Sequence, residues 1–172
     1  LESNTGYLDL YQLLQRRGGR DRLAPEEAQR ALKDAVFKRY TQEGCEARED
    51  TLKLLSLVGM FLPFLPLERE HLAQILAQSL GPRLSQLIEG ELGEPKAGLE
   101  GVEVRVAPEV PGWLAGKAEY DGRFALEGAK EVPTILARHV SRPARRFLHA
   151  NQSALNATAS RRPPALALML AA

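Results

Sequence analysis

The feature that most constrains the fold is an apolar run with two prolines, Phe61–Leu72, whose letters are FLPFLPLEREHL. Pro63 and Pro66 lack a backbone N–H donor and disfavour a helical conformation in the residue before each of them. The run from 61 to 65 is therefore expected to be extended. Directly after it, the sequence changes from apolar to charged.

A helix is expected to begin at Leu67. Glu68 and Glu70 suit the positive end of a helix dipole, and apolar residues then recur at helical spacing: Leu72, Ile75, Leu76 and Leu80. The whole stretch predicts a rigid strand-to-helix joint of the kind that connects two domains. An ordinary buried strand before an ordinary helix is the alternative.

Length and charge set the outer limits. At 172 residues the chain fits one large domain or two small ones. Its 23 basic and 22 acidic residues leave a formal net charge of +1, which predicts neither nucleic acid nor an acidic membrane as a partner. The sequence begins at Leu1 without a signal-peptide pattern, and we expect it to be the C-terminal part of a longer protein. The apolar run 165–172 is too short to span a bilayer.

Cysteine and histidine give no sign of a metal or thiol site. Cys45 is the only cysteine and lies in a polar stretch, which predicts an unreactive bystander. His71, His139 and His149 are not at metal-ligand spacing with one another or with a close set of carboxylates, and Glu70-His71 is not the His-Glu-x-x-His order of metalloproteases. No metal site is expected.

Three amphipathic helices are expected before the joint. The first carries apolar residues from Tyr7 onward and should stop at Gly18-Gly19. Pro25 suits the first position of the second helix. Asp50 or Thr51 can cap the third.

After the joint, the long helix should kink or break at Gly81-Pro82. Residues 90–98 resemble a linker, and the alternation of Val102–Val106 predicts a half-buried strand. Beyond a short helix opened by Pro108 and a loop at 120–124, a final helix is expected from Gly128 to about His149.

These segments resemble a known family. The order of Ser3-Asn4-Thr5-Gly6, the Ala31–Phe37 helix and the Phe61–Leu72 block is similar to the C-terminal half of torsins, AAA+ ATPases of the endoplasmic reticulum lumen and nuclear envelope. The later strand, short helix, loop and Gly-Ala-Lys helix start are similar to the small lid domain of the related Clp-type disaggregases. The likeness covers roughly residues 1–148, and the Phe-Leu-Pro-Phe-Leu-Pro-Leu-Glu block is its most specific part.

The resemblance implies an α+β fold that is mostly α. Residues 1–66 would form the C-terminal part of an AAA+ nucleotide-binding domain. Residues 67–148 would form a small helical lid domain with a short β edge containing Val102–Val106. The tail, 149–172, is rich in Ala, Ser, Arg and Pro and is expected to be disordered.

The resemblance also implies a site. Asn4 matches the catalytic sensor-1 position, whose amide orients the attacking water, and Lys130 with Gly128 and Ala129 matches the ATP-binding sensor 2, where amides at the helix start would assist. Without the family, Asn4 would be interpreted as a turn or cap residue and Lys130 as a solvated charge. Torsins carry Cys where this chain has Ala129, so thiol regulation is not implied.

ATP and Mg2+ are the implied cofactors, bound mainly by residues upstream of this chain. The Gly116-Lys117 pair is followed by Ala118, so it is no P-loop, and this fragment alone is expected to be inactive. The full-length protein would bind and hydrolyse ATP, as a chaperone, to remodel protein substrates.

The implied partners follow from a missing arginine. Clp-type chains place an arginine finger where this chain has Leu57, and no arginine occurs between Arg48 and Arg69. Torsins share this absence and take the arginine from an activator protein. The resemblance therefore implies a homo-oligomer with a trans-acting activator, in the endoplasmic reticulum lumen or nuclear envelope. Two glycosylation sequons, at Asn151 and Asn156, would suit a luminal protein.

The alternative is a non-enzymatic helical interaction module. Basic residues concentrate on the last helix and could form a docking face for an acidic protein or nucleic acid; they can equally complement a helix C-terminus. No aromatic residues interleave with them as in single-strand binding surfaces, so nucleic acid is not the expected partner. The residues are Arg138, His139, Arg142, Arg145 and Arg146.

Overall fold

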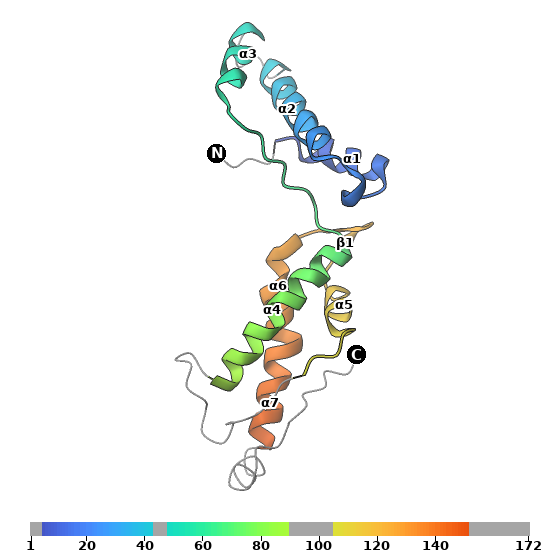
Figure 1. The fold of residues 1–172 in the computed structure, drawn as a ribbon, viewed down its shortest axis with the longest axis vertical. Coiled ribbons are helices and arrows are strands. Elements are labelled where there is room, and N and C mark those ends of the chain that lie inside the picture. The colour runs from blue at the N-terminus through green and yellow to red at the C-terminus, as the bar shows by residue number, and fades with distance from the viewer. Residues whose placement is uncertain (1–4, 43–47, 90–104, 152–172) are drawn as a thin grey trace. The chain divides into compact units, whose positions relative to one another are not determined.

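The computed structural model describes residues 5–42, 48–89 and 105–151. The chain divides into two compact units, Leu1–Pro66 and Leu67–Ala172. The described part is mostly helical with one two-stranded antiparallel sheet, so the predicted α+β class with mostly α structure is confirmed (Figure 1). Among the described residues, no helix is both long and apolar enough to cross a membrane. Several predicted features lie outside the described residues: Asn4, Cys45, the linker at 90–98, and residues 152–172 of the tail expected over 149–172, which include Asn156.

The first unit is built from four helical segments: α1 (Tyr7–Arg17), the short 3-10 helix η1 (Arg20–Arg22), α2 (Pro25–Gln42) and α3 (Arg48–Leu57). Helix α1 ends where the sequence predicts. Gly18 is left-handed (φ 77°), and the N–H groups of Gly18 and Gly19 donate to the Gln15 and Leu14 carbonyls. Helix α2 begins at Pro25, as expected from the preference of proline for the first turn.

The core of the first unit lies between these helices, because α2 packs against both α1 and α3. Its buried members are Leu10, Leu14, Leu23, Ala28, Ala35 and Leu55. An ion pair between Arg17 and Glu27 joins α1 to α2 at the surface. Residues 58–67 form neither helix nor strand. The strand part of the predicted joint, residues 61–65, is therefore not formed as a strand.

The second unit begins with the long helix α4 (Arg69–Glu89). Then follow α5 (Val110–Ala115), β1 (Tyr120–Asp121), β2 (Phe124–Ala125), the 3-10 helix η2 (Gly128–Glu131), α6 (Val132–Leu136), the π-helical η3 (Ala137–Ser141) and α7 (Arg142–Ala150). The last four segments follow one another without interruption, so the predicted helix from Gly128 to about His149 is present, although it includes 3-10 and π turns.

Of the kink or break predicted at Gly81-Pro82, the break is wrong, because α4 continues through Pro82. Proline there removes one hydrogen bond of the helix. The buried side chains on both sides outweigh this loss, since Leu80 and Leu84 are both within the core and fix the helix before and after the proline.

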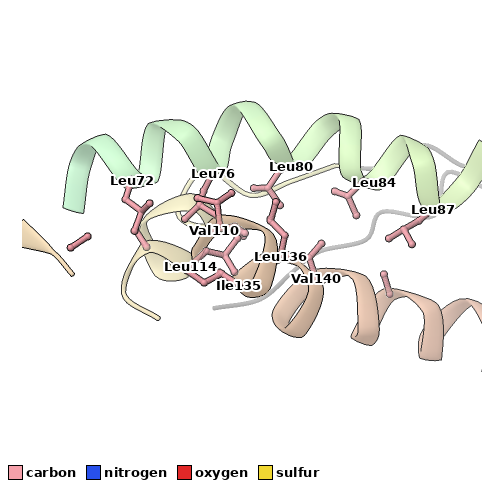
Figure 2. Packing of buried hydrophobic residues seen from close by; sticks show 14 residues of the cluster. Leu72, Leu76, Leu80, Leu84, Leu87, Val110, Leu114, Ile135, Leu136 and Val140 are labelled. Atoms are coloured by element: carbon pink, nitrogen blue, oxygen red, sulfur yellow. The ribbon is translucent and has the colours of Figure 1, made fainter. Parts of the chain in front are cut away.

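One leucine stripe of α4 forms the centre of the second unit (Figure 2). The stripe consists of Leu72, Leu76, Leu80, Leu84 and Leu87, at intervals of three or four residues that place them on one face. These side chains point toward α5 and the final helical segment, where they meet Val110, Leu114, Ile135, Leu136 and Val140. The helices are thus held together by apolar burial along the length of α4.

The small sheet is a correction to the sequence prediction, which placed a loop at 120–124. Tyr120 pairs with Ala125 and Asp121 with Phe124. Gly122 supplies the positive φ that the tight turn requires. The strand predicted at Val102–Val106 falls mostly outside the described residues, and its described end, residues 105–106, is not in a strand.

Candidate functional site

The predicted ATP-binding residues lie together in η2, a 3-10 helix of four residues. Gly128 is left-handed (φ 55°), and a Cβ at this position would lie 3.9 Å from Leu67 Cδ1, so η2 begins close to the start of α4. The side chain of Lys130 is exposed. Within the described residues its ammonium makes no ion pair or hydrogen bond, so it is open to an anion.

The structure shows how one backbone amide of the expected sensor-2 segment is used. The backbone N–H of Lys130 donates to the Glu127 carbonyl at 3.2 Å. This amide is therefore already used inside the 3-10 turn and is not available to a phosphate. Any contact of Lys130 with a nucleotide rests on its ammonium group alone. Asn4 lies outside the described residues.

A pocket of about 300 Å³ lies elsewhere in the second unit, where the start of α4, the end of α5 and the hairpin meet. Its lining residues are Glu68, Arg69, Glu70, Gly116, Tyr120, Gly122 and Arg123. This site was not predicted from the sequence. It is assembled by the hairpin, whose residues contact α4 from more than fifty positions further along the chain.

Glu68 is the buried anchor of this pocket, with an exposed fraction of 3%. Its Oε2 lies 3.3 Å from Nη2 of Arg123, which reaches it from the hairpin turn. Glu68 also forms an isolated antiparallel bridge with Phe124, and the Ala125 N–H donates to the Leu67 carbonyl at 2.8 Å. Backbone and side-chain bonds together fix the hairpin on the start of α4.

The opposite wall is fixed by contacts to the α5 end. The Tyr120 hydroxyl donates to the Ala115 carbonyl at 2.7 Å, and burial raises the pKa of Tyr120, which favours the protonated, donating form. Nη2 of Arg69 donates to the Gly112 carbonyl at 3.3 Å. A Cβ on Gly116 would lie 2.6 Å from that nitrogen, so a side chain at this position would displace the Arg69 guanidinium.

Glu68, Glu70 and His71 offer ligand atoms that all lie within 4.8 Å of one another. This proximity contradicts the sequence-based view that His71 has no close carboxylate set; the Glu-x-Glu-His order was the available signal. The Glu68 carboxylate, however, faces the Arg123 guanidinium, so a metal cation there would have to compete with an existing positive charge. The cluster is better explained as an ion-pair network.

The charges around the pocket are balanced, since two glutamates face two arginines. The pKa of Glu70 is lowered, chiefly by the hydrogen bond from its own backbone N–H and further by the nearby charge of Arg123, so this residue contributes a negative charge at neutral pH. A balanced pocket has no built-in preference for phosphate. The geometry of the pocket suits a structural role, which is to hold the hairpin against α4 and α5, better than it suits nucleotide binding.

A second polar cluster links α5 to η3. Trp113 and His139 lie edge to face with ring centroids 5.7 Å apart, and Nζ of Lys117 lies 4.3 Å from the centre of the Trp113 ring. Burial lowers the pKa of His139, and the nearby positive charges of Lys117 and Arg138 lower it further. His139 is therefore held in its neutral form by its surroundings.

Comparison of the chain with known protein families, curated proteins and solved structures gives no match.

Proposed function

We propose that the chain is the C-terminal portion of a torsin-like AAA+ ATPase that binds and hydrolyses ATP to remodel proteins. The observation that carries the proposal is the exposed ammonium of Lys130, in the short helix η2 that begins beside Leu67. The resemblance places sensor 2 at this lysine, just after the Gly-Ala pair. A small helical unit with its own apolar core along α4 suits the lid role.

In this proposal Lys130 acts as a point charge toward the γ-phosphate of ATP. Asn4 would have the separate role of orienting the attacking water. Phosphate cradle and Mg2+ ligands would be supplied by residues upstream of this chain. Bound ATP would supply the phosphoryl group. The role of the described residues would be to recognise the negative charge of the γ-phosphate.

The test is Lys130→Ala in the full-length protein, with Lys38→Ala as the matched control on the exposed surface of α2. Loss of one charge-assisted contact corresponds to about 1.5–3 kcal/mol, so ATP affinity should fall by roughly tenfold or more. Affinity is measured with a fluorescent ATP analogue, and circular dichroism checks the fold. Unchanged ATP affinity and turnover in Lys130→Ala would remove this residue from the site.

The same proposal implies a partner. Because no arginine lies between Arg48 and Arg69, an activator would supply the arginine finger, which is worth about 10³–10⁵ in rate in other nucleotide hydrolases. Basal turnover of the full-length protein, measured across a concentration range that permits self-assembly, should therefore be low. Fast turnover without any added protein would refute the need for an activator.

A luminal or nuclear-envelope location is part of the proposal and rests on the resemblance and on the sequons at Asn151 and Asn156. Glycosidase treatment of the full-length protein from cells should increase its gel mobility. A mobility that does not respond would count against this location.

A further inference from the structure

The last helical segment has an unusual distribution of charge. Residues 132–151 contain four arginines and no aspartate or glutamate. All four arginines are exposed, and we refer to them together as the basic face: Arg138, Arg142, Arg145 and Arg146. Arg142, Arg145 and Arg146 are three and four residues apart, so they lie on one side of α7.

The basic face is held in a fixed orientation. Val140 and Ala144, on the other side of the helix, are buried in the core of the second unit. Ser141 is 3% exposed, and its Oγ accepts a hydrogen bond from Nε of Arg83 on α4 at 3.0 Å. The helix cannot turn its arginines inward without breaking this packing.

The four guanidinium groups are not used inside the described part of the chain. No ion pair or hydrogen bond there involves any of their side chains. The positive field extends further, because Arg138 and Lys117 both disfavour protonation of His139, after the larger effect of burial. Like charges that are fixed in place and have no partner among the described residues favour an anionic ligand.

We infer that the basic face is a docking surface for an extended acidic segment of a partner protein. Arg142 and Arg146 are one turn apart, about 6 Å along the axis, and alternate side chains of an extended chain lie about 7 Å apart. Successive carboxylates can therefore meet successive guanidinium groups. Arginine, rather than lysine, also permits bidentate contacts with each carboxylate.

The composition of the surface favours protein over other polyanions. Phe147, next to Arg146, is 45% exposed, and arginine with an exposed aromatic is typical of protein interfaces. Nucleic-acid surfaces carry more positive charge, whereas this chain has a formal net charge of only +1. A membrane-surface helix inserts its apolar side into the lipid, but here Val140 and Ala144 are occupied by the core.

The test uses the whole chain and a fluorescent peptide of alternating glutamate and alanine, with binding followed by anisotropy. Arg142→Glu/Arg145→Glu should weaken binding by about tenfold or more, because like charges would then face each other. Arg16→Glu/Arg30→Glu removes the same charge from exposed sites in the first unit and should leave the affinity unchanged. Arg142→Lys/Arg145→Lys, which keeps the charge, should fall between these variants.

Three results would overturn the inference: equal binding of a peptide with glutamine in place of glutamate, an equal loss in the Arg16/Arg30 control, or tighter binding of single-stranded oligothymidine than of the acidic peptide. Circular dichroism verifies that the charge-reversed variant is folded. Lys130→Ala should bind the peptide normally, so this inference and the proposed ATPase function can fail separately.

Discussion

Arg123 and Glu68 form an ion pair between a half-exposed guanidinium and a buried carboxylate, with 3.3 Å between Nη2 and Oε2. The two residues lie 55 positions apart in the sequence. Together with the bridge from Glu68 to Phe124, this pair attaches the hairpin to the start of α4. The hairpin in turn leads directly into η2 and the final helix, so the pair helps to position Lys130.

Replacing Arg123 with alanine should lower the free energy of unfolding by about 1–3 kcal/mol, because the buried Glu68 carboxylate would lose its guanidinium partner. Urea denaturation measures the change. Arg138→Ala, which removes an exposed arginine without a described ion pair, should stay within about 0.5 kcal/mol of wild type. Equal effects of the two substitutions would show that the ion pair contributes nothing to stability.

Glu70 should make stability depend on pH in the acid range. Its pKa is lowered from 4.5, chiefly by the hydrogen bond from its own backbone N–H. A carboxylate with a lowered pKa in the folded state adds stability above the ordinary pKa, and this contribution is lost as pH falls through 4.5 toward the lowered value. The stability difference between wild type and Glu70→Gln should therefore shrink below pH 4.5 in urea titrations. A stability difference that stays constant at all pH values would contradict the lowered pKa of Glu70 as a source of stability.

The sequence predicts the helices well because their signals are local. Gly18 stops α1 through its left-handed backbone, and Pro25 starts α2 through its fixed φ. Of the kink or break expected at Pro82, the break is wrong. The local signal is the hydrogen bond that proline removes from the helix, and it does not include the burial of Leu80 and Leu84, which tertiary packing supplies.

The hairpin and the pocket could not be predicted in the same way. Strands of two residues have no periodicity to detect, and the sequence of Tyr120–Phe124 indicates only a turn around Gly122. What stabilises the hairpin is contact with Leu67 and Glu68, which are distant in sequence. The position of Lys130 in η2 is described, whereas its role and that of Asn4 still rest on the resemblance.

A substitution in the core of one unit should destabilise that unit and leave the other unit unaffected. Leu76 is fully buried in the second unit and Leu14 in the first, and truncating either to alanine should cost about 2–5 kcal/mol. Hydrogen exchange followed by mass spectrometry should localise the loss of protection: to α4 and α6 in Leu76→Ala, and to α1 and α2 in Leu14→Ala. Equal loss throughout the chain in either variant would mean that the units unfold together.

The surroundings of His139 should make the second unit less stable in mild acid. Its pKa is lowered from 6.5, first by burial and then by Lys117 and Arg138. Because the unfolded chain binds a proton on this histidine more readily than the folded one, stability should fall as pH drops from 6.5 toward the lowered value.

Lys117→Met removes one of the repelling charges and should raise the pKa of His139 part of the way, since burial remains. Lys117→Arg keeps the charge and should leave the pKa lowered. NMR titration of the His139 ring proton measures both variants, and an equal pKa in Lys117→Met and wild type would exclude Lys117 as a cause.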